Sequence, residues 1–135
     1  MALIYELKMK VRDYECDAQG VVNNANYLHY FEATRHELME DCGLRLRDLT
    51  DDHILPLLRS AKVEYLHSLR GSDEFLSRVR IERRGIRYFF LQDIIRISDN
   101  VLCAKGEIEV VCLIDGKVSK PDLFDRVMSD YITWR

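Results

Sequence analysis

Only one stretch of this sequence has the pattern of a long helix, and this limits the architectures open to the chain. Across residues 24–42, mostly apolar side chains recur at helical spacing. That stripe consists of Tyr27, Leu28, Phe31, Arg35, Leu38, Met39 and Cys42. Asn23 or Asn24 can cap the start of the helix, and Gly43 suits its end. A helix of this length extends about 28 Å, so it must lie along a large part of the fold.

Nearly all of the remaining chain has the pattern of β-strands joined by short turns. Residues 5–12 alternate between apolar and charged side chains, as in a strand with one buried face. Further strands are predicted at 54–69, 75–84, 86–97, 102–114 and, after the hairpin turn Asp115-Gly116, at 117–118. Residues 45–53 form a polar link in this interpretation. Pro121 permits a short amphipathic C-terminal helix, whose apolar residues are Leu123, Phe124, Val127 and Met128.

Short turns make consecutive strands antiparallel neighbours, and a single helix must bury its apolar stripe on one face of their sheet. The sequence therefore predicts the α+β class, with one long central helix wrapped by a curved antiparallel β-sheet and a short C-terminal helix. We expect residues 1–135 to form a single domain, because this length is short for two.

Charge and cysteine usage exclude several classes of function. The chain has 20 Lys and Arg against 23 Asp and Glu, a net charge of −3, which argues against a dedicated nucleic-acid binder. It has no apolar run of about 18 residues, so we expect no membrane span and a cytoplasmic protein. No metal site is expected, because neither the four cysteines nor the four histidines show ligand spacing. The cysteines are expected to be structural thiols: Cys16, Cys42, Cys103 and Cys112.

The densest group of unusual residues lies in the segment 11–27, which leads into the predicted helix. Asp17 precedes the helix start by seven residues. A helix start presents unpaired backbone N–H groups and partial positive charge, which suit a developing oxyanion. Asp17 could supply the attacking group, as a nucleophile or by taking a proton from water, and Gly20 lets the backbone lie close to a ligand. A loop Asp before a helix is also commonly a cap or a solvated turn, so the residues alone leave both interpretations open.

The pattern of this segment resembles the opening signature of the hotdog-fold acyl-CoA thioesterases, and most nearly the 4-hydroxybenzoyl-CoA thioesterase family. The matching residues are Arg12-x-x-Glu15-x-Asp17-x-x-Gly20-x-Val22-Asn23-Asn24-x-x-Tyr27, followed by Tyr30-Phe31-Glu32-x-x-Arg35. The Val-Asn-Asn-x-x-Tyr portion is also similar to the acyl carrier protein (ACP) thioesterases. The predicted order of a strand, a long helix and then antiparallel strands is the hotdog order, so the resemblance covers the whole chain.

The resemblance implies hydrolysis of an acyl-CoA or acyl-ACP thioester to a free carboxylic acid and a thiol. It makes Asp17 the catalytic carboxylate and the Asn24 backbone N–H the group that polarises the thioester carbonyl. The substrate-binding positions that it implies are Gly20, Val22, Asn23 and Tyr27. No cofactor is implied, since coenzyme A is part of the substrate. Tyr27, Phe31 and Arg35 also match helix positions that pack the fold.

The sequence departs from the family pattern at two places. Many relatives carry an aromatic pair where this chain has Asn23-Asn24, which affects the side chains at the helix start but not the backbone N–H. Relatives often have Pro-x-x-x-Gly-Asp in the turn after the second strand, where this chain has residues 69–73 of different sequence.

A site for coenzyme A needs cationic groups near its mouth, because the carrier has phosphates. The best local cluster is Arg83-Arg84-Gly85-Ile86-Arg87, and Arg84 and Arg87 are the expected phosphate contacts. Ordinary exposed arginines beside a turn are the alternative interpretation.

Two other functions stay open at this point. A hotdog hydratase or dehydratase needs a well-placed His, and the loop-to-helix segment has none. A non-catalytic acyl-CoA-binding hotdog protein would not need Asp17.

Apolar residues in the later strands exceed what one buried face requires. In residues 86–97 these are Phe89, Phe90, Leu91, Ile94 and Ile95. The period of two must turn some of them away from the central helix, and a second copy of the chain is the simplest cover. We therefore expect at least a homodimer, extended to a homotetramer as in hotdog relatives, with Asp17 of one chain facing groups of the next.

Overall fold

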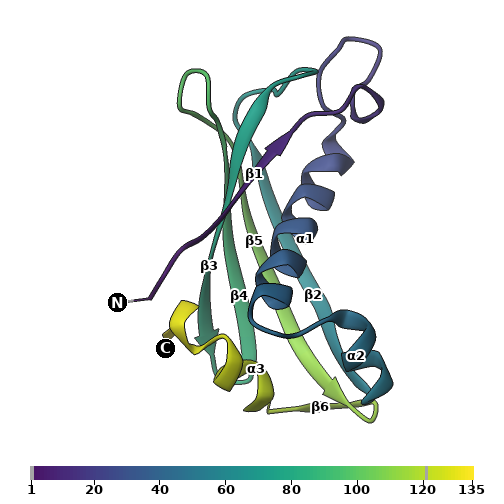
Figure 1. The fold of residues 1–135 in the computed structure, drawn as a ribbon, viewed down its shortest axis with the longest axis vertical. Helices are drawn as coiled ribbons and strands as arrows, with labels where there is room; N and C mark the ends of the chain where they lie inside the picture. Colours follow the sequence, from purple (N-terminus) through teal and green to yellow (C-terminus); the bar gives the residue numbers. More distant parts are fainter. Residues whose placement is uncertain (1, 121) are drawn as a thin grey trace.

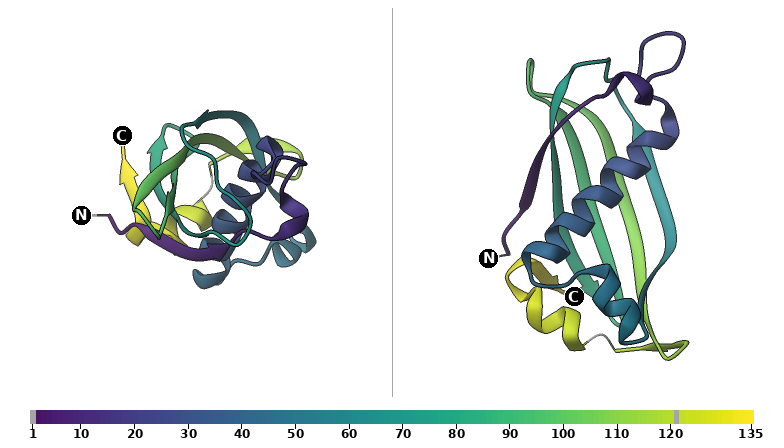
Figure 2. Two further views of the ribbon diagram at one scale, coloured as in Figure 1. Left: turned by 90° about the horizontal axis from the view of Figure 1, so that it is seen from above. Right: turned by 45° about the vertical axis from the view of Figure 1, so that its right-hand side comes forward.

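The computed structural model describes residues 2–120 and 122–135, and it shows a curved sheet with one long helix on its concave side (Figure 1). Seen along its long axis, the sheet is strongly curled (Figure 2). The strands are β1 (Tyr5–Lys10), β2 (Ile54–Tyr65), β3 (Glu74–Arg84), β4 (Arg87–Arg96), β5 (Val101–Ile114), β6 (Lys117–Ser119) and β7 (Ile132–Trp134). The helices are α1 (Asn24–Asp41), α2 (Leu46–Asp51) and α3 (Asp122–Val127), with 3₁₀ turns at Asp13–Glu15 and Ser129–Tyr131.

The main strands follow the order β1-β3-β4-β5-β2, and all of their pairings are antiparallel. The short β6 pairs with β5, and the short β7 lies parallel to β3. Among the described residues, no strand pairs with the outer edge of β2, which we call its free edge. This arrangement confirms the predicted α+β architecture with a short C-terminal helix, although Pro121, from which that helix was predicted, lies outside the described residues.

The long helix begins at Asn24 as predicted and ends at Asp41, one residue before the predicted end, with Cys42 as its C-cap. Asn23 is the N-cap residue, and Gly43 follows the helix with a φ of +90°, a conformation that glycine adopts without strain. The buried face differs from the predicted stripe, because Leu28 is 39% exposed whereas Tyr30 and Thr34 are buried. The hydroxyl of Thr34 donates to the Tyr30 carbonyl at 2.8 Å and so enters the core with its hydrogen bond satisfied.

Two short elements lie where the sequence predicts none. The predicted polar link contains α2, which buries Leu49, and the C-terminus contains β7, where Ile132 is paired with Ile81 of β3. Six and three residues are too few to show a reliable period, so tertiary contacts decide their conformation. The predicted strand 54–69 is shorter in the structure, because residues 66–69 leave the sheet after β2.

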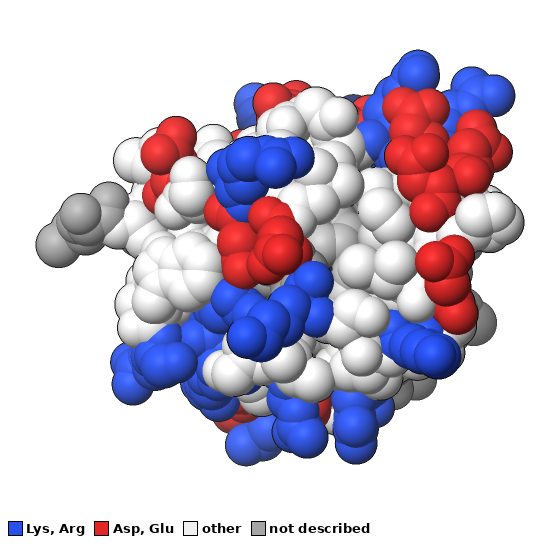
Figure 3. Space-filling model, turned by 90° about the horizontal axis from the view of Figure 1, so that it is seen from below, with Lys and Arg blue, Asp and Glu red and all other residues white. Residues whose placement is uncertain are grey.

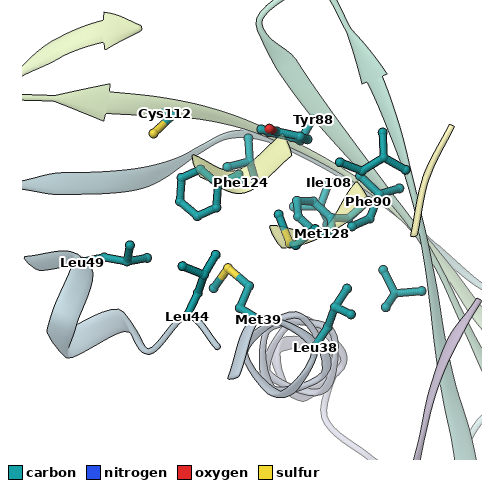
Figure 4. Packing of buried hydrophobic residues seen from close by; sticks show 14 residues of the cluster. Leu38, Met39, Leu44, Leu49, Tyr88, Phe90, Ile108, Cys112, Phe124 and Met128 are labelled. Carbon is teal, nitrogen blue, oxygen red and sulfur yellow. The ribbon is translucent and has the colours of Figure 1, made fainter. Parts of the chain in front are cut away.

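Two clusters of buried side chains hold α1 against the sheet. One packs the C-terminal half of α1 against β3–β5 and α3, and Figure 4 shows Met39 facing Phe124 and Met128 across this core. The other surrounds Tyr30, Phe31 and Phe75 near the start of the helix. All four cysteines are free thiols, with Cys103 and Cys112 fully inside the core.

Candidate active site

Asp17 lies on a tight turn ahead of α1. The Gly20 N–H donates to the Asp17 carbonyl at 3.0 Å, and Gly20 has a φ of +77° that the turn requires. The Gln19 N–H donates to Oδ1 of Asp17 at 2.8 Å. Within the described part of the chain, Oδ2 of Asp17 accepts no hydrogen bond. The turn therefore orients the carboxylate and leaves one of its oxygens open on an exposed side chain.

The start of α1 leaves the backbone N–H of Asn24 open. Oδ1 of Asn23 accepts from the Ala25 N–H at 3.0 Å, and the Asn23 carbonyl accepts from the Asn26 N–H at 2.9 Å. The Asn24 N–H has no acceptor among the residues that the structure describes. The cap thus satisfies the neighbouring donor and leaves the Asn24 N–H unpaired at the helix terminus.

Glu15 ties the loop to the helix. Its carboxylate Oε1 accepts from the Arg12 N–H at 2.7 Å and from the Tyr30 hydroxyl at 2.9 Å. Its carbonyl accepts from Nδ2 of Asn26 at 2.7 Å. Burial, and then the bond to Glu15, raise the pKa of Tyr30 above its ordinary value, so the phenol stays a donor. Sequence reasoning placed Glu15 in the motif but gave it no role.

Asp17 and Asn24 line the same cavity, which has a volume of about 360 Å³. The other lining residues are Val21, Val22, Tyr27, Tyr65, Leu66, His67 and Ser68. The Tyr65 hydroxyl donates to the Asn24 carbonyl at 3.2 Å, which brings the end of β2 to the start of α1. The sequence analysis missed the four residues from β2 and the segment after it, since only the sheet places them here.

The remaining expected substrate contacts have structural partners. Gly20 shapes the turn and Asn23 caps the helix, and neither lines the cavity. The Tyr27 ring is buried, and its hydroxyl accepts from the Leu69 N–H at 3.1 Å. Burial raises the pKa of Tyr27, although the bond to Leu69 opposes that rise. Val22 is buried and lines the cavity, so it contributes an apolar surface.

Arg84 and Arg87 lie far from Asp17 within one chain. The strand β3 starts after Arg70, which bridges to Val21 beside the Asp17 turn, and its eleven residues extend about 33 Å to Arg84. Arg84 pairs with Glu82 at 2.7 Å, and Arg87 with Glu109 at 3.1 Å. Figure 3 shows acidic side chains between the basic ones at this end of the molecule. Carboxylates thus already compensate the charge of both arginines.

The described residues contain neither a metal-binding cluster nor a membrane-spanning helix. The described ranges hold no cluster of three or more His, Cys, Asp or Glu that could bind a metal ion. In the same part of the chain, no helix is both long enough and apolar enough to cross a membrane.

Comparison with known proteins gives consistent matches. The sequence model of the thioesterase-like superfamily matches residues 11–130. The acyl-acyl carrier protein thioesterase ATL3, chloroplastic, of Arabidopsis thaliana is 33% identical over 109 residues, which are 78% of this chain. This chain spans only 57% of the length of that plant protein. The acyl-CoA thioesterase YbgC of Haemophilus influenzae is 25% identical over 124 residues, 90% of this chain and 89% of the relative.

Solved structures share the fold. A 1,4-dihydroxy-2-naphthoyl-CoA thioesterase from Synechocystis superposes with a TM-score of 0.87 at 17% identity, covering 94% of this chain and 96% of that one.

Proposed function

The chain belongs to the thioesterase-like superfamily, and we propose that it hydrolyses an acyl thioester to a free carboxylic acid and a thiol. The observation that carries this proposal is that Asp17 and Asn24 line one cavity, each with a group left open by its local hydrogen bonds. An open carboxylate oxygen and an open helix-terminal N–H are the two groups that attack on a carbonyl requires.

In the proposed reaction the Asn24 N–H binds the carbonyl oxygen as it becomes negative. Asp17 takes a proton from water as the water adds to the carbonyl carbon. The C–S bond then breaks, and the departing sulfur takes up the proton to leave as the thiol. If Asp17 attacks directly, the C–S bond breaks as an acyl-aspartyl anhydride forms, and water then cleaves the anhydride and supplies the proton that the departing thiolate takes up. Both routes use the same two groups and the same cavity.

The substrate class proposed is an acyl-CoA or an acyl-ACP. Both carriers occur in the names of the relatives, ACP in the plant protein and CoA in YbgC. The arginines Arg84 and Arg87 can contact a carrier phosphate only at the site of another copy, given their distance from Asp17 in their own chain. Arg87 of β4 pairs with Val111 of β5, and Val111 pairs in turn with Leu57 of β2. Arg87 therefore lies level with Leu57 on the free edge.

The proposed assembly is a homodimer through the free edge of β2, with a tetramer formed from two such dimers. The exposed large apolar residues of this strand are Leu55, Leu57, Leu58 and Tyr65. In the strand that the sequence analysis singled out, Phe89, Leu91 and Ile95 are half-buried on the outer face and Phe90 and Ile94 lie in the core, the split expected from a period of two. The edge of β2 is a second apolar surface, which the sequence analysis did not single out. Antiparallel pairing of two β2 strands about a two-fold axis brings the Asp17 end of one chain beside the start of β2 in the other.

A panel of thioesters tests the function. Free thiol is followed with a chromogenic thiol reagent for saturated, aryl and enoyl acyl-CoAs and for an acyl-ACP, with the Asp17→Asn variant as control. Thiol release that depends on Asp17 supports the proposal. Loss of the enoyl absorbance without thiol release would instead indicate a hydratase, which His67 in the cavity would serve. Tight acyl-CoA binding without either signal would indicate a binding protein.

A further inference from the structure

A second cavity, of about 300 Å³, lies between α1, α2 and the first half of β2. It shares no lining residue with the cavity that contains Asp17. Its polar residues are Glu32, Arg35, His36 and Thr50. Its apolar residues are Met39, Leu46, Leu55, Pro56, Leu58, Phe90 and Val110. Its volume lies at the lower end of the range for small-molecule sites, and an apolar wall with few polar groups is their usual composition.

Arg35 is the unusual residue of this cavity, because it is a buried cation without an ion-pair partner. Only 8% of the residue is exposed, and none of the described carboxylates lies within ion-pair distance of it. Its one hydrogen bond runs from Nη1 to Oε1 of Gln92 at 3.0 Å. The amide of Gln92 is itself fixed, since Nε2 donates to the Phe31 carbonyl at 3.0 Å.

The guanidinium has spare hydrogen-bonding capacity, and its charge is compensated only in part, by the Phe90 ring 5.9 Å away and by the charge of Glu32. An arginine side chain carries five N–H donors, and among the described residues only Nη1 of Arg35 has an acceptor. Burial lowers the pKa of Arg35 to about 10, which leaves the side chain charged at neutral pH. A buried charge that is only partly compensated is costly, and an anion that brings its own hydrogen-bond acceptors would offset that cost.

A much smaller apolar pocket, of about 10 Å³, lies next to this cavity. Four lining residues of the larger cavity, Met39, Pro56, Phe90 and Val110, also line this pocket, which extends to Cys112, Phe124 and Met128. Figure 4 shows Phe124, Met128 and Met39 meeting in this region. The cavity of about 300 Å³ therefore places the Arg35 cation beside apolar side chains, and the hydrocarbon surface within it comes from its own lining.

We propose that this cavity binds an apolar monocarboxylic acid, with its carboxylate on Arg35 and its hydrocarbon part along Met39 and Phe90. The planar guanidinium pairs with both carboxylate oxygens, which its free donors allow. Glu32 lines the same cavity and its charge opposes that of the ligand, so it sets a limit on the affinity. The site does not use Asp17 and does not depend on the proposed hydrolysis.

Calorimetric titration of the full chain carrying Asp17→Asn tests this inference, because that variant separates binding from turnover. We expect octanoate to bind at least about tenfold more tightly than octanol, since a hydrogen-bonded charge pair contributes more than apolar contact alone. Arg35→Gln is expected to remove that preference, and Glu32→Gln to strengthen octanoate binding. The matched control is Arg47→Gln, which removes a positive charge from the exposed face of α2 and should leave the affinity unchanged.

Equal affinities for octanoate and octanol would overturn the inference, as would equal effects of Arg35→Gln and Arg47→Gln. Circular dichroism checks that each variant is folded. If Arg35→Gln fails to fold, Arg35→Lys and Glu32→Gln test the inference in its place. Both variants keep a cation in the cavity and must retain the preference for octanoate, and loss of that preference in both would overturn the inference. A negative result in the thioester panel leaves these titrations unaffected.

Discussion

The ring of Phe31 fills the space into which a side chain at Gly106 would project. A Cβ on Gly106 would lie 2.7 Å from Cε2 of Phe31, closer than carbon atoms approach. Phe31 is fully buried on α1, and Gly106 is in the middle of β5. Because Gly106 has no side chain, the Phe31 ring can pack directly against β5. This contact helps to fix the position of α1 on the sheet.

We predict that Gly106→Ala destabilises the protein by about 1–3 kcal/mol, the usual cost of an overpacked core. Urea denaturation measures the change. Adding Phe31→Leu should recover part of the lost stability, because the smaller leucine side chain leaves room for the new Cβ. Gly71→Ala is the control, since its Cβ would have 3.9 Å to the nearest atoms and no positive φ. Equal destabilisation by the two glycine variants would contradict the packing explanation.

Asp17→Asn is predicted to lower kcat for thioester hydrolysis by about 10²–10⁴, as expected when one acid–base or nucleophilic group is lost. The fold should persist, because the Asn side chain keeps an Oδ1 that can accept from the Gln19 N–H. The comparison variant is Asp13→Asn, in the same loop but outside the cavity, which should retain its activity. Hydrolysis by Asp17→Asn within about threefold of the parent would exclude both proposed routes.

Asn24→Pro and Asn24→Ala separate the backbone donor from the side chain. Proline is well tolerated at the first residue of a helix, and Asn23, with φ −64° and ψ 140°, already has the conformation that precedes proline. Asn24→Pro should therefore fold but lose turnover, whereas Asn24→Ala should keep most of it. Neither Asn24 variant removes the helix cap, because the cap residue is Asn23. The loss of stability expected on removing a cap, about 1 kcal/mol, is therefore predicted for Asn23→Ala. Equal activities of the two Asn24 variants would remove the oxyanion assignment.

Much of the fold and the centre of the site follow from local sequence. The helix at 24–41 was predictable from its period, and so was the turn at Asp115-Gly116, where both residues have positive φ. Asp17 and Asn24 line one cavity because a short loop connects them. His67 reaches the same cavity only through the register of the sheet. The position of Arg84 at the far end of β3 is also a property of the assembled sheet, which no local pattern encodes.

Glu82 is predicted to make stability depend on pH in the acid range. It is 4% exposed and contacts three arginines, Arg80, Arg84 and Arg135. The hydrogen bond from Arg84 holds the pKa of Glu82 below its ordinary value of 4.5, although burial opposes this effect. The folded state therefore binds this proton less readily than the unfolded chain. The stabilisation is present above about pH 4.5 and is lost as the pH falls toward the lowered pKa.

Urea denaturation of Glu82→Gln at pH 7 and near pH 3.5 checks the sign. The variant should be less stable than the parent at pH 7, and the two should converge in acid. Glu107→Gln is the matched control, because Glu107 is 3.7 Å from Arg84 and much more exposed. A Glu82→Gln deficit that is the same at both pH values would contradict the linkage.

The free edge of β2 gives the last prediction, which concerns assembly. Leu55 and Leu57 are 48% and 42% exposed on this strand, whose outer backbone groups face no other strand in the described chain. Charged side chains prevent edge strands from pairing, so Leu55→Lys with Leu57→Lys should convert the protein to a monomer of 15.9 kDa in sedimentation. If the site needs groups from a second copy, thioester hydrolysis falls with the dimer. Val118→Lys alters an equally exposed apolar residue on β6 and should change neither property. A parent protein that sediments as a fully active monomer at micromolar concentration would rule out a shared site.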